Sequence, residues 1–228
     1  RHTRLRTVTG VHVCSSDLRM FTEYIHTGDL QRLNCNYKLE TSHPSCRSIN
    51  MVISHRMPSI TSMESSIQID TTIPGFDRMA LEINHNGNFK TMTSTGSLVT
   101  PFAVVRRAAY TIDHDVSNYK NMRSAVALNL PNGELGYSFN YKGFPLKFTT
   151  GLTVSTPFPG YNRYELTLDH TSRNVENINS IAQLSTPMGN FGYSIQHTGP
   201  LRNFDTNMEL TTPFSGYQRY ALVIDHKS

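Results

Sequence analysis

The sequence has no tryptophan, only three cysteines, and no apolar run of the roughly 18–20 residues that a membrane-spanning helix requires. Charged residues make up 17% of the chain, below the ~25% of an average globular domain, which argues against a coiled coil or a charged disordered tail. Hydrophobic residues reach only 37%, but Thr, Ser, Tyr, Phe and Ile are plentiful. This mixture is typical of strands with one apolar and one polar side.

The first 18 residues differ in character from the rest. The segments 8–11 and 13–18 resemble the translation of a sequencing-library adapter with a frame shift, so residues 1–18 are interpreted as non-native and set aside. Without them the chain has 18 basic and 16 acidic side chains. The net charge of +4 is therefore mostly an N-terminal feature and not the footprint of a nucleic-acid-binding protein. We expect residues 19–228 to be one repetitive region, a fragment of a larger chain.

Internal repetition is the strongest signal in the sequence. Residues 152–170 and 208–226 are identical at 10 of 19 positions, at an offset of 56. A second phase lies halfway between, where GYSFNYKG at 136–143 corresponds to GYSIQHTG at 192–199. Together these copies give one repeat about every 28 residues. The positions that end successive repeats are His26, His55, His85, His114, Tyr141, His170, His197 and His226.

Each repeat contains two alternating segments joined by residues that favour turns. In the last copy, Tyr220, Leu222 and Ile224 face one way, and the positions between them face the other. Period two is the mark of a half-buried strand, and the Pro and Gly of the breaker at 212–216 are turn residues. Short connections make consecutive strands antiparallel. We therefore expect an all-β fold, an antiparallel meander of about 15 strands forming one large, curved, open amphipathic sheet.

The repeated pattern TPF-x-GY-x-RY-x-L-x-(L/I)-DH, followed by GYS-x-x-H-x-G, resembles the amphipathic β-strand repeats of apolipophorins and apolipoprotein B-like proteins. These belong to the large lipid transfer protein superfamily. The resemblance implies a secreted, extracellular lipoprotein subunit that binds neutral lipid and phospholipid and works with the remainder of the same large polypeptide. Two copies depart from the pattern: residues 103–105 replace the Gly-Tyr pair, and the copy at 74–85 has one turn residue fewer.

One side of such a sheet is apolar, and no helix in the sequence can cover it, so it must meet a second sheet, a membrane or lipid. If lipid covers it, the contacts come from the apolar positions of alternate strands. The predicted lipid-binding residues are Met79, Leu81, Ile83, Tyr110, Ile112, Tyr137, Phe139, Tyr164, Leu166, Leu168, Tyr193, Ile195, Tyr220, Leu222 and Ile224.

Cysteine usage is compatible with secretion. Cys35 and Cys46 flank a turn signal at 42–45, and a disulfide between them would close a short loop and contribute about 2–3 kcal/mol. The alternative is two free thiols. We expect the disulfide.

The recurring histidines suggest a metal, because imidazole is a common metal ligand. Successive members lie on alternate strands about 9–10 Å apart, too far to share an ion, so we expect no metal site and interpret them as a polar end to each apolar stripe. Ser, His and Asp recur along the chain and do not form one cluster. We expect no catalytic site, no cofactor, no nucleic-acid partner and no enzyme.

Two other functions fit the alternating pattern. An outer-membrane-type β-barrel also uses strands of about ten alternating residues, although the nearly equal connections on both edges argue against it. A structural or adhesive β-repeat protein would pack its apolar side against a neighbouring subunit. Lipid binding and transport remains the leading hypothesis.

Overall fold

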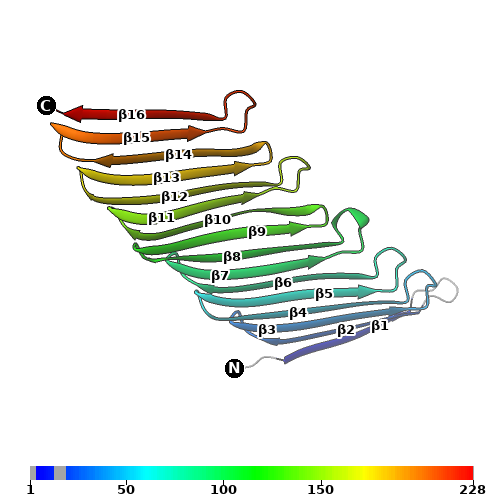
Figure 1. Cartoon of the computed structure of the whole chain (residues 1–228). Coiled ribbons are helices and arrows are strands. Elements are labelled where there is room, and N and C mark those ends of the chain that lie inside the picture. The colour runs from blue at the N-terminus through cyan, green and yellow to red at the C-terminus, as the bar shows by residue number, and fades with distance from the viewer. Residues whose placement is uncertain (1–3, 13–18, 228) are drawn as a thin grey trace. The chain divides into compact units, whose positions relative to one another are not determined.

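The computed structural model describes residues 4–12 and 19–227, with side chains from residue 19 onwards. In these residues 16 strands pair in chain order as one open antiparallel meander (Figure 1). The strands are β1 (Arg4–His12), β2 (Arg19–Gly28), β3 (Arg32–Thr41), β4 (Ser48–Ser59), β5 (Ser62–Thr71), β6 (Arg78–Gly87), β7 (Thr91–Val99), β8 (Arg107–Asn118), β9 (Asn121–Leu130), β10 (Gly133–Phe144), β11 (Lys147–Ser155), β12 (Arg163–Asn174), β13 (Asn177–Thr186), β14 (Gly189–Thr198), β15 (Asn203–Thr211) and β16 (Arg219–Lys227).

The predicted all-β meander is confirmed, with two strands in each repeat of about 28 residues. Strands β2 to β16 are the 15 expected between residue 19 and the end. One further strand, β1, lies inside the segment that we set aside, and it pairs with β2 from Arg4↔Thr27 to His12↔Arg19. The described part of the chain contains no helix long and apolar enough to cross a bilayer.

Contacts divide the chain into two compact units. Unit 1 comprises residues 1–112 and 128–131, and unit 2 comprises residues 113–127 and 132–228. Within unit 1 neighbouring strands pair antiparallel from β1 to β7, with a register shift between Arg56 and Ser59 of β4. Within unit 2 neighbouring strands pair antiparallel from β10 to β16, with a register shift between Ser172 and Asn174 of β12.

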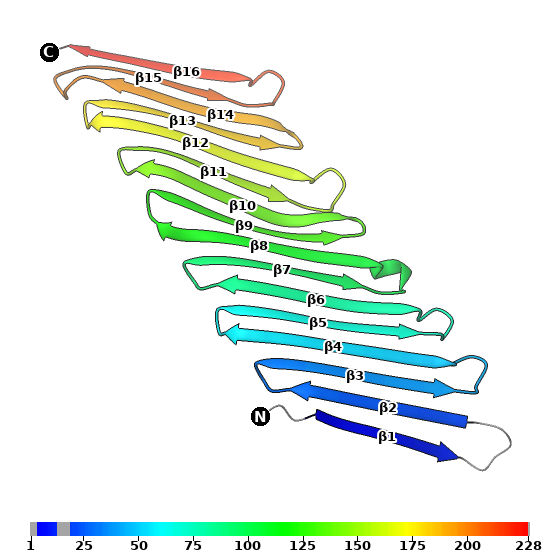
Figure 2. The ribbon, with the colours of Figure 1, turned by 90° about the horizontal axis from the view of Figure 1, so that it is seen from below.

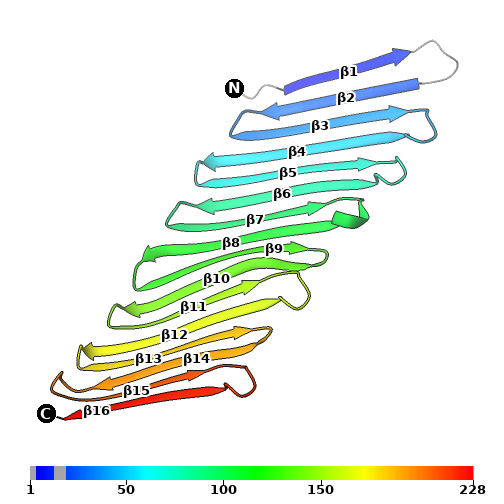
Figure 3. The ribbon, with the colours of Figure 1, turned by 90° about the horizontal axis from the view of Figure 1, so that it is seen from above.

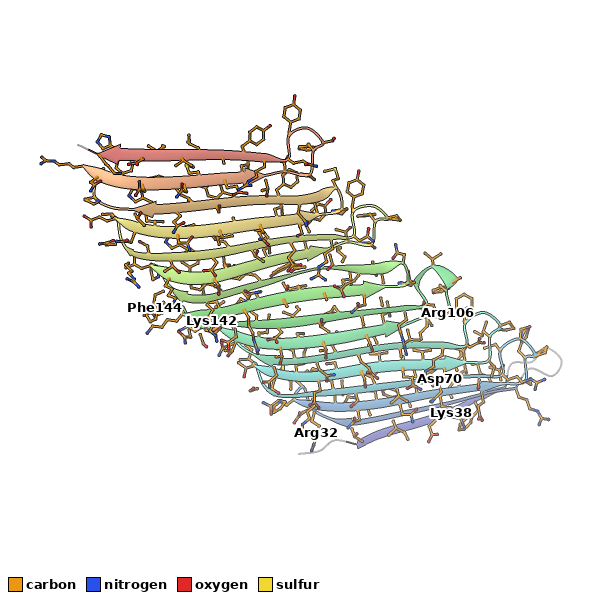
Figure 4. All side chains as sticks on the ribbon, viewed as in Figure 1. Arg32, Lys38, Asp70, Arg106, Lys142 and Phe144 are labelled. Carbon is orange, nitrogen blue, oxygen red and sulfur yellow. The ribbon has the colours of Figure 1, made fainter. Side chains whose placement is uncertain are left out.

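Connections fall on two edges of the meander, seen from two further directions in Figures 2 and 3. One edge, here called the turn edge, carries the seven connections between β2 and β3, β4 and β5, and so on to β14 and β15. The other, the loop edge, carries the remaining described connections. Figure 4 shows Phe144 and Lys142 toward the turn edge and Arg106 toward the loop edge.

Five connections on the loop edge are long loops built on the same threonine-centred scaffold. In the loop that follows Thr156, the Thr156 hydroxyl donates to the Tyr161 carbonyl at 2.5 Å and accepts the Phe158 amide at 3.4 Å. The Thr156 amide also donates to the Asn162 carbonyl, which closes the loop at 2.9 Å. The same contacts recur after Thr41, Thr71, Thr100 and Thr212.

The shared scaffold explains both departures in the repeat. The loop after Thr71 has lost no residue, contrary to our sequence prediction, because Phe76 accepts from Thr71 as Tyr161 does from Thr156. The fifth residue of the loop, counted from its threonine, is a glycine in three of the copies. Two of these residues, Gly160 and Gly216, have φ of 81° and 83°, a left-handed conformation that favours glycine. Two loops lack this glycine: Ser45 takes its place after Thr41, and Val104 takes it after Thr100, where the short 3₁₀-helix η1 (Ala103–Val105) replaces the turn.

Candidate functional site

The two sides of the sheet differ in chemistry in both units. In unit 2, Leu166 of β12 lies opposite Leu152 of β11 and Leu184 of β13, whereas its neighbour Glu165 lies opposite Thr153 and Ser185. Unit 1 repeats the arrangement with a row of apolar residues across β4, β5 and β6. We call the side that carries these rows the apolar face and the other the hydrophilic face. The row in unit 1 is Ile53, Ile67 and Leu81, continued by Leu98 of β7.

Pairing places the predicted lipid-binding residues of β6, β10, β12, β14 and β16 on the apolar face of their own unit. Tyr110 of β8 joins the face in unit 1, because its ring lies over Gly96 and its hydroxyl is 3.2 Å from Ser94 Oγ. Ile112 follows Tyr110 by two residues and so points to the same side. Sequence alternation therefore identified this face correctly in both units.

The apolar face is incompletely covered. No large side chain in residues 19–227 is fully buried, and Tyr137, Leu166, Tyr193 and Leu222 are 38–52% exposed. The apolar rows of both units are therefore open to solvent in the described residues.

The hydrophilic face carries the ion pairs. Arg219 of β16 contacts Glu209 of β15 at 2.8 Å, and Arg78 of β6 contacts Asp70 of β5 at 3.8 Å. These side chains are well exposed, so each pair contributes little to stability. Their significance is orientation, because they place paired charges on the side opposite the apolar rows.

Histidines lie where the apolar stripes end, as predicted, and those of β4, β6, β8, β12 and β14 face a hydroxyl-bearing side chain on the next strand. His170 Nδ1 lies 2.6 Å from Ser180 Oγ, and His55 Nδ1 lies 2.7 Å from Ser65 Oγ. The remaining partners are Ser124 for His114 at 3.1 Å and Thr206 for His197 at 2.7 Å, with Ser94 opposite His85 in the register. Each of these five imidazoles thus lies opposite a hydroxyl-bearing residue on the next strand.

Two of these serines also bind a tyrosine on the strand that follows. Ser124 Oγ is 3.1 Å from His114 Nδ1 and 3.2 Å from the Tyr137 hydroxyl. Ser94 makes the equivalent 3.2 Å contact with Tyr110. The polar tips of these tyrosines are therefore satisfied within the protein, and their rings contribute apolar area to the face.

Tilted ring pairs extend the row of histidines in unit 2. Phe148 lies 5.1 Å from the ring of His170, and Phe204 lies 5.5 Å from His197 and 5.4 Å from His226, measured between centroids. Such contacts place an aromatic ring beside each of these three imidazoles.

Cys35 takes the place of the hydroxyl opposite His26. Its sulfur lies 3.1 Å from His26 Nδ1 and 3.7 Å from the Tyr24 hydroxyl, and the residue is 8% exposed. The hydrogen bond with Cys35 raises the pKa of the Tyr24 hydroxyl, and desolvation raises it further by a smaller amount. The site therefore follows the same pattern as the serine sites, with a thiol as the small polar group.

The predicted Cys35–Cys46 disulfide is wrong for this structure, in which both cysteines are free. Cys46 lies in the loop that begins at Thr41, where its carbonyl accepts the Thr41 hydroxyl. Six residues of extended β3 separate Cys35 from Thr41, a distance of about 20 Å, and a disulfide needs Cα atoms within about 7 Å. Cys14 lies outside the described residues.

Sequence reasoning missed the partners of the histidines and the loop threonines. Each hydroxyl partner follows its histidine by nine or ten residues, as in His55 and Ser65 or His197 and Thr206. This spacing was visible in the sequence, but its meaning depends on the pairing register. Within residues 19–227 no three His, Cys, Asp or Glu side chains converge on a metal-binding arrangement.

No protein-family model, curated protein or solved structure matches the chain. The fold defines it as an open amphipathic β-meander with one apolar face, and the similarity to apolipophorin repeats rests on the repeated residues alone.

Proposed function

We propose that the chain binds and transports lipid, with its apolar face lying on neutral lipid and phospholipid. The observation that carries the proposal is the row pattern: half-exposed Tyr, Leu, Ile and Phe side chains line one face of each unit, opposite a face that carries ion pairs. Lipid suits this face because it is fluid, and it covers a broad surface that has no enclosing pocket.

The ends of the apolar stripes also favour a lipid surface. Tyrosine and histidine combine an apolar ring with a polar edge, and such side chains suit the boundary between hydrocarbon and water. His170, with Ser180 beside it, and Tyr137, with Ser124 beside it, occupy such positions. The resemblance to apolipophorin repeats supports the same proposal and extends it to an extracellular lipoprotein particle, in which this region is part of a larger polypeptide.

A charge scan of neighbouring strand positions tests the proposal. Leu166→Glu and Leu222→Glu place a carboxylate on the apolar face, and the matched controls Thr167→Glu and Val223→Glu place it on the hydrophilic face. Loss of one buried Leu costs about 1.5–3 kcal/mol, and a charge in hydrocarbon adds to this cost. We expect at least tenfold weaker flotation with phosphatidylcholine-coated triolein droplets for the first pair and little change for the controls.

The remaining outcomes separate the alternatives. Equal losses for both pairs would indicate a sheet covered on two sides. If no variant floats differently and sedimentation shows the lipid-free chain as a stable oligomer, the apolar face packs on another copy and the lipid proposal is wrong.

A further inference from the structure

The turn edge carries a second apolar feature that the meander itself does not require. Each of its seven connections presents one large apolar side chain to solvent, and five of these are 84–98% exposed. We call these residues the edge tips. They are Leu30, Ile60 and Phe89 in unit 1, and Tyr119 (66% exposed), Leu146 (58% exposed), Val175 and Leu201 in unit 2.

The turns do not need these apolar side chains for their own structure. In the tip at Phe89, the Asn88 side chain accepts the backbone amides of Lys90 at 2.8 Å and Thr91 at 3.2 Å. Phe89 itself lies between the acceptor and its donors, at a position where polar residues serve equally well. Asp29 and Asn118 hold the tips at Leu30 and Tyr119 in the same way.

Positive charge accompanies the edge tips. Lys90, Lys120, Lys147 and Arg202 each follow a tip residue directly in the sequence. Lys120 also lies 4.5 Å from the centroid of the half-exposed Phe144 ring. Against these cations the seven connections contain two acidic residues, Asp29 and Glu176, and the Asp29 carboxylate already accepts two backbone amides.

An exposed apolar group beside a cation is the chemistry that binds a phospholipid surface, where hydrocarbon lies just below anionic headgroups. The turn edge is also where the histidines end the apolar stripes. We propose that the edge tips insert into the phospholipid layer that borders the lipid on the apolar face, and that the neighbouring cations select anionic headgroups. This inference rests on the proposed function and adds a second, headgroup-specific contact to it.

The absence of tryptophan allows a direct test. Phe89→Trp and Leu201→Trp each introduce a single fluorescent reporter, one in each unit, and Val223→Trp on the hydrophilic face is the control. The chain is mixed with triolein droplets coated with phosphatidylcholine, alone or with an equal part of phosphatidylserine. We expect blue-shifted emission and quenching by shallow spin-labelled phospholipid for both tip reporters, and unchanged emission for the control.

The charge component has its own readout. Lys90→Gln should weaken binding to the phosphatidylserine-containing droplets about fivefold, with no change on pure phosphatidylcholine. If the chain floats but the tip reporters stay in water, the tips do not insert, although lipid binding stands. Insertion with no effect of Lys90→Gln would overturn the headgroup selection. If the parent chain does not float at all, the proposed function itself fails.

Discussion

His170 and Ser180 lie directly opposite each other on β12 and β13, with Nδ1 2.6 Å from Oγ. The pair belongs to a series in which the imidazoles of β2, β4, β8, β12 and β14 each meet a hydroxyl or thiol on the next strand. A polar group that is removed from water is costly unless it forms a hydrogen bond. The pairing supplies that bond to both the imidazole and the hydroxyl where the apolar row ends.

Ser180→Ala should reduce the free energy of unfolding by about 0.5–1.5 kcal/mol, because the imidazole of His170 loses its partner. Ser194→Ala, on the hydrophilic face of β14, is the matched control and should cost less. Guanidinium unfolding followed by circular dichroism gives the comparison. Equal midpoints for both variants would show that the pair contributes nothing.

Gly160→Val and Gly216→Val should each destabilise their loop by at least about 1–2 kcal/mol, because their φ of 81° and 83° suits glycine and not a β-branched residue. A Cβ at either position meets no atom within 4 Å, so the cost comes from the backbone and not from a clash. Gly160→Asn should cost less, because Asn tolerates the left-handed region. Thermal melts of the three variants test this order, and a Val variant as stable as the parent contradicts it.

Thr156→Val keeps the side-chain shape and removes the hydroxyl that joins Phe158 to Tyr161 across the loop. We expect about 1–3 kcal/mol lower stability, because the Tyr161 carbonyl loses its donor. Thr153→Val, on the hydrophilic face of β11, is the control. Hydrogen exchange should quicken at the Asn162-bonded amide of residue 156 in the first variant only; unchanged exchange there would refute the scaffold role.

Alkylation under non-reducing conditions should modify both Cys35 and Cys46 once the chain is unfolded, because neither is in a disulfide. In the folded chain Cys46 should react faster, since Cys35 is buried beside His26. Mass spectrometry of the digested peptides measures both rates. A linked Cys35–Cys46 peptide would contradict the structure. Cys35→Ser should be tolerated, because serine occupies this place opposite other histidines.

Ser117 donates its hydroxyl to Asp115 Oδ1 at 2.6 Å and its amide at 3.1 Å, and these bonds hold the pKa of Asp115 below its ordinary value. The carboxylate therefore stabilises the fold at neutral pH. This contribution persists above the ordinary value of 3.8 and disappears as the pH falls through the lowered pKa. Ser117→Ala should raise the Asp115 pKa in a carbon-detected NMR titration; an unchanged value would mean that the amide alone lowers it.

Much of this protein follows from local sequence. Tyr220, Leu222 and Ile224 lie on one face because successive side chains of a strand alternate, and this rule needs no knowledge of the neighbouring strand. The sequence also places Gly216 in a turn, because Pro and Gly interrupt the alternation there, and in the structure Gly216 has the positive φ that such a turn uses. Strand number, direction and the composition of the apolar face were predictable for the same reason.

Other features exist only after the strands pair. Ser180 becomes the partner of His170, and Cys35 is carried away from Cys46, because the register decides which residues oppose each other across about 5 Å and which are separated by a strand length. The edge tips are similarly invisible in a single repeat. Phe89 is one apolar residue in a turn, and it becomes part of an edge because the meander returns to the same side after every second strand.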